Sequence, residues 1–232
     1  MEFVVGMNLM NNLEVLYEDN HVIVVVKPFN ILSQADNTND LVMLTIVKYY
    51  LKKKYDKPGN VYLGLVHRLD RPVGGIMVFA KTSKAASRLS DQVRTRTLKK
   101  TYLAVTTGII EKDGDELVNY IVKCSDNSSK ITVKDSGKIA KLKYKVLYRN
   151  YEENLTLVSI ELETGRHHQI RVQMANIGYP LYGDQRYGKQ DKNQIALFAC
   201  KLEFVHPTTK EIIKIEKFPE KVGVWKVLKN VK

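Results

Sequence analysis

Residues 61–72 read VYLGLVHRLDRP and place one acidic residue, Asp70, among ionisable neighbours at the end of an apolar run. The apolar residues predict a buried strand over 61–67, and Pro72 followed by Gly74 and Gly75 predicts that regular structure stops after the acid. Asp70 is therefore expected on a loop at a strand end, where reacting groups are often held. A surface ion pair within an Arg-Leu-Asp turn is the alternative for this tetrapeptide taken alone.

Two later segments carry side chains that could complete a site around such a carboxylate. Residues 99–105 read KKTYLAV, an alternating strand with Tyr102 next to a pair of lysines. Without a motif around it, an aromatic residue in a strand is expected to be part of the core.

The second segment, residues 165–174, reads GRHHQIRVQM and predicts a short helix over 167–177 that ends at Gly178. Ile170, Met174 and Ile177 would form its buried face. On such a helix His167 and Arg171, four residues apart, would share a face.

These segments together resemble the RluA-type RNA pseudouridine synthases. The signature of that family has a His-Arg-Leu-Asp strand end, a Lys-x-Tyr strand and an Arg-x-His-Gln-Ile-Arg helix, in this order and at about this spacing. All three are present here. Residues 17–28, 178–188 and 204–207 also resemble the family, so the resemblance extends from about Leu13 to about Pro219.

The resemblance implies that the chain isomerises uridine to pseudouridine without a cofactor or a metal. Asp70 would be the nucleophile, and Arg171 would pair with it and keep it ionised, because desolvation alone would raise the pKa of the carboxyl group. Tyr102 would stack on the extruded uracil and could serve in proton transfer from carbon 5. Arg68 would hold the place of the flipped nucleotide in the RNA stack. Attack on the ribose and attack on the base both stay open.

The net charge of +12 favours a polyanionic partner such as RNA. Half of that charge lies in residues 81–102, where seven cations face the single acid Asp91. We expect phosphate contact from this segment, whereas the lysines at 52–54 read as a solvated helix face. The residues expected to contact RNA or to shape the site are His67, Arg68, Arg71, Arg88, Arg94, Arg96, Lys99, Lys100, Arg166, His168 and Gln169.

The pattern along the chain predicts an α+β fold. The resemblance implies a pseudouridine synthase-like, mixed and largely antiparallel sheet in two packed halves, with flanking helices and a central cleft. Helices are expected at 41–54, with Leu41, Leu44, Val47 and Leu51 on the apolar face, and at 83–95, with Ser83 as cap and Ala86, Leu89 and Val93 as stripe. Loops are expected at 56–60, 124–130 and 183–194. Strands are expected at 13–17, 22–27, 61–67, 76–81, 100–107, 140–148, 155–163, 196–205 and 211–217.

The length and composition of the chain limit its domain organisation and its location in the cell. With 232 residues, 44% of them hydrophobic, the chain is long enough for a full core, and we expect an N-terminal extension at 1–12 and one catalytic domain at 13–232. It has no apolar run of membrane-spanning length and no signal-peptide pattern, which predicts a cytoplasmic protein. Cys124 and Cys200 have no partners at metal-ligand spacing and are expected to be reduced.

The chain departs from the family pattern at two places. Val73-Gly74-Gly75 stands where the family usually has Thr-Ser-Gly, and His167 stands where it prefers Thr or Ser. A hydroxyl group that could brace the loop is missing, and a titratable ring is added. We expect activity to be retained, with altered turnover or pH dependence.

Other classes of protein fit less well. A retaining glycosidase needs a second carboxyl group, which the three motifs lack, and a zinc enzyme needs ligands that the His167-His168 pair does not have nearby in sequence. A non-catalytic RNA-binding or RNA-folding protein is the serious alternative. Because the resemblance begins near Leu13, we expect no separate N-terminal RNA-binding domain, and a monomer without an obligate protein partner that recognises a stem-loop of ribosomal or transfer RNA.

Overall fold

The computed structural model describes residues 12–35, 40–189 and 192–230, which form two compact units. The first unit holds the chain up to Leu98 and returns for Lys201–Lys217. The second holds Lys99–Cys200 and the segment from Phe218 onward. The predicted extension at 1–12 lies, apart from Asn12, outside the described residues, and the prediction of one catalytic domain over 13–232 stays a prediction.

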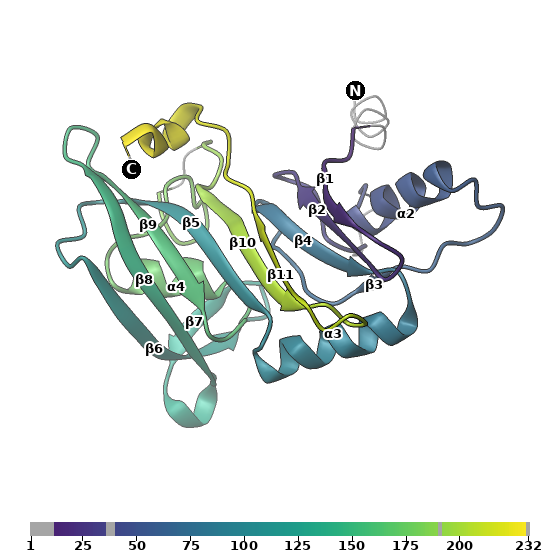
Figure 1. Ribbon diagram of the computed structural model, residues 1–232. Helices are drawn as coiled ribbons and strands as arrows, with labels where there is room; N and C mark the ends of the chain where they lie inside the picture. Colours follow the sequence, from purple (N-terminus) through teal and green to yellow (C-terminus); the bar gives the residue numbers. More distant parts are fainter. Residues whose placement is uncertain (1–11, 36–39, 190–191, 231–232) are drawn as a thin grey trace. The chain divides into compact units, whose positions relative to one another are not determined.

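In the first unit, single helices separate consecutive pairs of strands (Figure 1). β2 pairs antiparallel with both β1 and β4, β3 pairs with the far end of β4, and β11 pairs antiparallel with the second half of β10. The elements are β1 (Val15–Glu18), β2 (Val22–Lys27), α2 (Met43–Lys54), β3 (Gly64–Leu65), β4 (Gly74–Ala80), α3 (Ser83–Thr95), β10 (Leu197–Val205) and β11 (Ile212–Glu216). Of β10, only the part from Lys201 onward belongs to this unit.

The core of the first unit follows from its apolar strands. β2 reads VIVVVK, and Val22 to Val25 have no exposed surface. α3 packs its Ala85 and Leu89 against this core, together with Phe204 of β10. Burial of such side chains contributes about 2 kcal/mol each, which favours a position between two other strands for the apolar strand β2.

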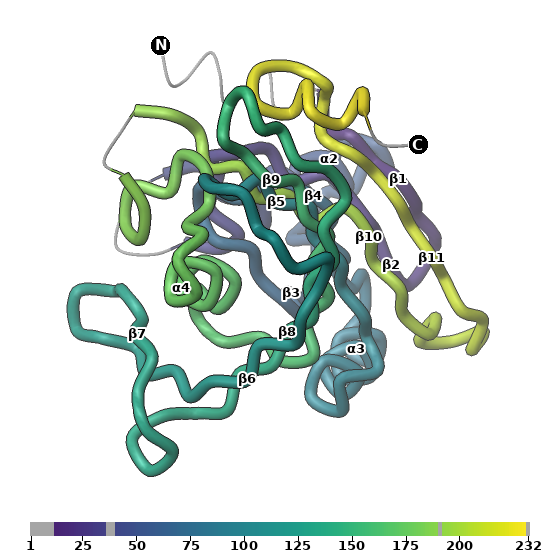
Figure 2. Tube along the Cα trace, turned by 90° about the vertical axis from the view of Figure 1, so that its left-hand side faces the viewer, coloured from purple at the N-terminus to yellow at the C-terminus, as the bar shows by residue number. Residues whose placement is uncertain are grey.

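The second unit is a meander of long antiparallel strands with one helix. β5 pairs with β9, β9 with β8, β8 with β6 and β6 with β7. α4 packs against β6 and β7, as Figure 2 also shows. The elements are β5 (Lys99–Thr107), β6 (Gly114–Lys123), β7 (Ser129–Thr132), η1 (Lys134–Ser136), β8 (Lys138–Asn150), β9 (Leu155–Leu162), α4 (Gln169–Asn176) and η2 (Gly223–Asn230).

The α+β class with antiparallel pairing is confirmed, as is the helix over 83–95. The expected strand at 22–27 is found with these bounds, and the other strands that are found have ends shifted by one or two residues. The central cleft stays a prediction. None of the helices in the described part of the chain is long and apolar enough to cross a membrane.

The predicted strand over 61–67 is wrong, because only Gly64 and Leu65 pair with β4. The apolar run is buried as a loop, and the following turn bonds to side chains instead of to a neighbouring strand. Regular structure also does not stop at Gly74, which begins β4. Gly75 pairs with Lys27 and has φ of +126°, a conformation that favours glycine.

The start of the third helix is also wrong. α4 begins at Gln169, and His168 before it is left-handed, with φ of +52°. His167 therefore lies outside the helix and does not share a face with Arg171 on it. The predicted buried residue Ile177 is only partly buried.

Three smaller corrections concern other helices and strands. Thr82, not Ser83, caps α3, and its hydroxyl accepts from the amide of Ala85. Ser129 and Lys130, expected in a loop, open β7, and β6 was missed because only Leu117 and Ile121 in it are buried. The buried faces of two helices also differ from the predicted ones. On α2 the buried residues are Met43, Ile46, Val47 and Leu51. On α3 the predicted apolar residues Ala86 and Val93 are only partly buried.

Candidate active site

Asp70 lies on a tight turn between β3 and β4 in the first unit. Its carbonyl oxygen accepts from the amide of Val73 at 3.0 Å. Ser33 fixes the peptide before it, because the Ser33 hydroxyl donates to the carbonyl of Leu69 at 2.8 Å and accepts from the amide of Leu69 at 3.1 Å. Both Ser33 and Leu69 are buried. The backbone that presents Asp70 is thus held on both sides.

Lys27, at the end of β2, also forms hydrogen bonds with this turn, and its side chain has no exposed surface. Its ammonium group donates to the carbonyls of Pro28 at 3.0 Å, Arg71 at 3.0 Å and Val73 at 2.6 Å. Burial lowers the pKa of Lys27 to about 7, while the negative charge of Asp70 opposes that shift and Arg71 adds to it. A cation at this place favours the ionised form of Asp70.

The residues around Asp70 divide into buried and exposed ones. His67 is buried, and its Nε2 accepts from the amide of Val78 at 3.1 Å, which assigns the ring proton to Nδ1. Arg68 is exposed, as required for the proposed insertion into an RNA stack. Arg71 is also exposed and forms an ion pair with Asp40 at 2.8 Å.

Tyr102 and Lys100 lie on the same side of β5 in the second unit, two residues apart. Tyr102 is buried opposite Ile160 of β9, with 5% of its surface exposed. Lys100 is half-buried, and burial lowers the pKa of its ammonium group. Lys99, the first residue of β5, is exposed.

Arg171 on α4 is held by an acid that the sequence analysis did not assign. Its guanidinium group makes two parallel hydrogen bonds with Asp184, Nε to Oδ2 at 2.8 Å and Nη2 to Oδ1 at 2.7 Å. The amides of Arg186 and Tyr187 also donate to Asp184. Burial opposes ionisation of Asp184, but Arg171 and these amides outweigh it and hold the pKa of the carboxyl group below its usual value.

The ring of Tyr187 lies next to this ion pair, and a pair of stacked histidine rings lies next to Tyr187. Arg171 lies 5.2 Å from the ring centre of Tyr187, whose hydroxyl group bonds to Nδ1 of His168 at 2.9 Å and accepts from the amide of Ser129 at 2.7 Å. The ring of His167 stacks on His168 at 3.8 Å. Burial, followed by the charge of Arg171, lowers the pKa of His168 to about 3, so this ring is neutral near pH 7.

Gln169 and Arg166 close the loop before α4. Oε1 of Gln169 accepts from the Thr164 hydroxyl at 2.8 Å and the Arg166 amide at 3.0 Å, and its Nε2 donates to the carbonyl of Lys141 at 3.0 Å. Nε of Arg166 donates to the carbonyl of Ile139 at 2.8 Å. These contacts set the position of the loop, and contact with RNA stays a prediction for both residues.

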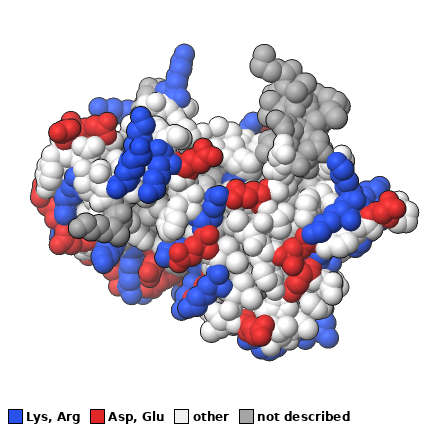
Figure 3. All heavy atoms as spheres, turned by 45° about the horizontal axis from the view of Figure 1, so that its top comes forward, with Lys and Arg blue, Asp and Glu red and all other residues white. Residues whose placement is uncertain are grey.

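The basic segment after residue 81 is partly engaged in contacts of its own. Arg88 donates to the carbonyl of Pro207 at 2.6 Å, and Arg94 pairs with Asp91. Arg96 is exposed at the end of α3, with φ of +63°. On the face drawn in Figure 3, cationic and acidic side chains are interspersed, so a site for RNA has to be argued locally rather than from net charge.

The structure thus places the predicted site residues in two separate groups, one in each unit. Asp70 lies with Lys27 in the first unit, and Arg171 lies with Asp184, Tyr187 and His168 in the second. The predicted pairing of Asp70 with Arg171 joins the two units and stays a prediction. The roles of Tyr102 and of the RNA-contact residues also stay predictions.

Sequence reasoning missed Ser33, Ser129 and the functions of Lys27 and Asp184. Lys27 could have been found, because a lysine that ends an otherwise apolar strand is a candidate for a buried cation. Asp184 offered a weaker signal as an acid among the cations of its loop. Ser33 and Ser129 offered none, since a single serine in a loop usually bonds locally or to water.

A sequence model described as RNA pseudouridylate synthase matches residues 21–176, which include Asp70, Tyr102 and Arg171. The chain belongs to this family. That confirms the resemblance drawn from the three motifs. Relatives named ribosomal large subunit pseudouridine synthase C and D support the same assignment.

Three curated relatives show how much of this chain matches known members of the family. The RNA pseudouridine synthase YhcT of Bacillus subtilis is 37% identical over 209 residues, 88% of this chain and 68% of that protein. The ribosomal large subunit pseudouridine synthase D of Pseudomonas aeruginosa is 38% identical over 76% of this chain and 53% of that protein. Synthase C of Buchnera aphidicola is 33% identical over 87% of this chain and 65% of that protein. The chain therefore spans between about half and two thirds of their length.

Solved structures agree on the fold. The human RNA pseudouridylate synthase domain containing 4 superimposes with a TM-score of 0.76 at 21% identity, over 94% of this chain and 92% of that one. The human RNA pseudouridylate synthase domain containing 1 gives a TM-score of 0.75 at 23% identity, over 93% and 87%. The pseudouridine synthase fold expected from the motifs is confirmed.

Proposed function

We propose that this chain isomerises uridine to pseudouridine in structured RNA, with Asp70 as the nucleophile. The observation that carries the proposal is the family match over residues 21–176, in which an acid stands on the turn braced by Lys27 and Ser33. A buried cation below the turn favours a carboxylate there. An ionised carboxylate is the form that can attack carbon or accept a proton.

The reaction rearranges bonds without net oxidation or hydrolysis. The N1–C1′ bond of uridine breaks, the freed uracil turns, and a C5–C1′ bond forms. A proton leaves carbon 5 and N1 gains one, so the atoms balance without a cofactor. Asp70 acts either by adding to the sugar or base or by taking a proton from the ribose, and both routes end with the carboxylate restored.

Three further residues complete the proposed machinery. Arg171 pairs with Asp70 in addition to its bonds with Asp184, since a guanidinium group has five N–H donors and Asp184 engages two of its nitrogens. Tyr102 stacks on the extruded uracil. Arg68, which is exposed, takes the place of that base in the RNA.

The proposed substrate is a stem-loop in ribosomal RNA, with transfer RNA as the second choice. Relatives at 33–38% identity are named for the large ribosomal subunit, which favours that RNA. Loop bases are accessible for flipping, whereas the deep groove of an RNA helix is not. We further propose that the chain acts in the cytoplasm as a monomer without an obligate protein partner.

Tritium release from RNA labelled at carbon 5 of uridine tests the reaction, because the isomerisation frees that label. RNA from cells that lack this gene is incubated with the wild-type protein, with Asp70→Ala or with Asp91→Ala, an exposed acid on α3 as the matched control. We expect release by the wild type and by Asp91→Ala, and none by Asp70→Ala. Release by Asp70→Ala would contradict the role of the acid. Binding of RNA without release by the wild type would favour the non-catalytic RNA-binding alternative.

A further inference from the structure

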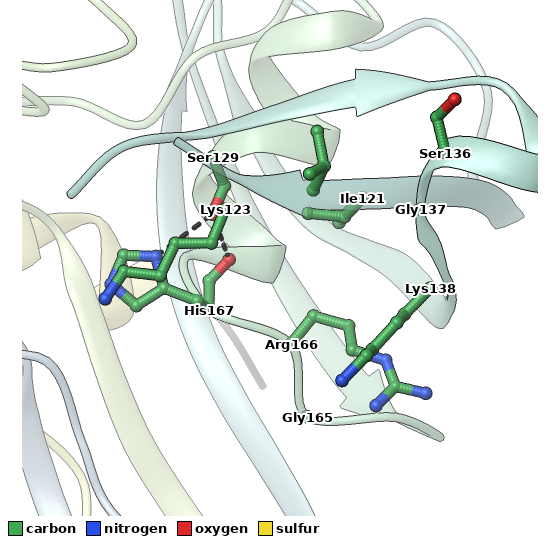
Figure 4. A pocket seen from close by; sticks show the side chains of 10 residues that line it. Ile121, Lys123, Ser129, Ser136, Gly137, Lys138, Gly165, Arg166 and His167 are labelled. Atoms are coloured by element: carbon green, nitrogen blue, oxygen red, sulfur yellow. Dashed lines mark hydrogen bonds between the residues drawn. The ribbon is translucent and has the colours of Figure 1, made fainter. Parts of the chain in front are cut away.

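The second unit contains a cavity of about 520 Å³ where β6, β7 and β8 meet the loop before α4. Its volume falls in the usual range for small-molecule sites, about 300–1,000 Å³. Figure 4 shows the side chains of Lys123 and His167 at one end of this cavity and those of Arg166 and Lys138 at the other. The floor between the two ends includes Ile121, which is buried in the sheet.

The lining of this cavity is cationic. The described residues that line it include Lys123, Lys138 and Arg166, and no Asp or Glu. Lys123 and Lys138 are exposed and form no ion pair with any residue of the described ranges. Their charges are therefore available to an anion, unlike Arg94 on α3, which pairs with Asp91.

Two of the lining side chains are fixed by contacts within the unit. The Ser129 hydroxyl, on β7, bonds to Nδ1 of His167 at 3.0 Å and to its carbonyl at 2.9 Å, and Figure 4 draws these contacts as dashed lines. The bond from Nε of Arg166 to the carbonyl of Ile139 leaves the outer nitrogens of that guanidinium group to face the cavity. Prearranged groups lose less entropy when a ligand binds.

We propose that this cavity is a subsite for one unstacked nucleotide of the RNA substrate, with its two flanking phosphates at the two cationic ends. The inference rests on the proposed function, because it assigns a subsite of the same RNA. Lys123 contacts one phosphate, and Lys138 with Arg166 contacts the other. The nucleoside lies between them against Ile121 and the ring of His167, because unstacked bases bind on apolar and aromatic surfaces.

The position of the cavity in the chain connects it with the reaction. Arg166 and His167 belong to the loop that leads into α4, and Arg171 is on the first turns of that helix. A nucleotide held in the cavity would therefore fix the loop next to Arg171. His167 is one of the two departures from the family pattern, so this subsite would give the chain a preference of its own for the neighbouring nucleotide.

Binding of a short single-stranded oligouridylate, measured as a function of salt, tests the phosphate contacts. Each of Lys123→Gln and Lys138→Gln should lower the slope of log affinity against log salt by about 0.7, equivalent to roughly eightfold weaker binding at about 50 mM salt. Lys145→Gln is the matched control, since Lys145 is an exposed lysine on β8 outside the cavity. Its slope should equal that of the wild type.

Two results would overturn the proposal. One is an unchanged slope in both cavity variants, and the other is an equal loss in Lys145→Gln, which would mean diffuse attraction. Inorganic phosphate serves as a further probe. If Lys138→Gln weakened its binding as much as that of oligouridylate, the cavity would be a site for free anions rather than for RNA.

Photo-cross-linking places the nucleotide independently of charge. Oligonucleotides that carry 4-thiouridine should cross-link to the lining residues around Ile121 and His167, and cross-links confined to other segments would contradict the subsite. The binding and cross-linking measurements do not require the protein to convert uridine to pseudouridine. Absence of tritium release would therefore contradict the proposed function, while the binding data would still decide whether the cavity takes a nucleotide.

Discussion

The turn of Asp70 and the cluster around Arg171 hold their charged groups in different ways. In the first unit a buried ammonium group, Lys27, donates to the backbone carbonyls of Arg71 and Val73, which follow the acid. In the second unit Arg171 is held by the carboxylate of Asp184 in a two-bond ion pair. The first arrangement fixes the main chain of the turn, whereas the second fixes the side chain of Arg171 itself.

The difference follows from what each group has to do. For the proposed nucleophile Asp70, the bonds of Lys27 and Ser33 fix the backbone of the turn. A guanidinium group that stabilises charge works best when its orientation is fixed in advance. The comparison predicts that removing the ion pair of Arg171 and Asp184 lowers the free energy of unfolding more than removing a contact of the Asp70 turn. Removing a contact of the turn should lower activity more, relative to the stability lost.

The largest effect is expected for Asp184→Ala. The substitution leaves the buried guanidinium group of Arg171 without its carboxylate and should lower the free energy of unfolding by about 4 kcal/mol. Urea titration followed by circular dichroism measures the loss. Asp126→Ala is the control, because Asp126 is exposed and lies 4.0 Å from its arginine, and it should leave the midpoint close to that of the wild type. Equal midpoints for Asp184→Ala and the wild type would contradict the role given to this ion pair.

Lys27→Met should cost about 3 kcal/mol, because it leaves three carbonyls without their donor. The loss should also depend on pH. The folded pKa of Lys27 is about 7, below the usual value, so the unfolded chain binds more protons between pH 7 and about 10. The stability of the wild type relative to Lys27→Met should therefore rise with pH in this window, by up to about 1.4 kcal/mol per pH unit.

Paired urea titrations of wild type and Lys27→Met at several pH values measure this difference. Lys214→Met, at an exposed lysine of β11 paired with Glu203, supplies a control that should show no such trend. A gap between wild type and Lys27→Met that stays constant with pH would show that the buried amine keeps an ordinary pKa.

A smaller loss of stability, roughly 1.5 kcal/mol, is expected for Ser33→Ala, which removes both hydrogen bonds to the Leu69 peptide. Because that peptide precedes Asp70, turnover should fall more than tenfold with little change in KM. Steady-state tritium-release kinetics measure both constants. Ser90→Ala, on the exposed side of α3, should match the wild type. A proportionate rise in KM with unchanged kcat would mean that Ser33 acts on binding of RNA instead.

The smallest effect at neutral pH is expected for His168→Asn. Asparagine tolerates the left-handed backbone at this position and can still bond to Tyr187, so stability at pH 7 should change by less than about 0.5 kcal/mol. The pKa of His168 is lowered to about 3, so the unfolded chain takes up a proton first as pH falls below about 6.5. The wild type should therefore lose stability on acidification relative to His168→Asn, by up to about 1.4 kcal/mol per pH unit.

Acid titration of both proteins at fixed urea concentration measures this difference. Parallel curves for His168→Asn and the wild type between pH 6.5 and 4 would show that the pKa of the His168 ring is not lowered by folding.

Local sequence patterns correctly predicted the helix and strand in which the spacing of apolar residues selects the conformation. The run VIVVVK at 22–27 is a strand and residues 83–95 are a helix, because in both the apolar spacing alone selects the conformation. The same logic failed for 61–67, whose apolar residues are equally dense. There, Ser33 and Lys27, more than thirty residues away, bond to the turn that follows the run.

The sequence by itself determined the family, the α+β class and the acid, tyrosine and arginine expected to react, because motif order and spacing survive in the primary structure. Only the tertiary structure decided what holds them, namely Lys27 under the Asp70 turn, Asp184 on Arg171, and a helix that begins at Gln169 instead of His167. The physical reason is the distance along the sequence between the residues that interact. Apolar periodicity is read from neighbours in sequence, whereas a buried charge or carbonyl takes whichever partner the folded chain brings within hydrogen-bonding distance.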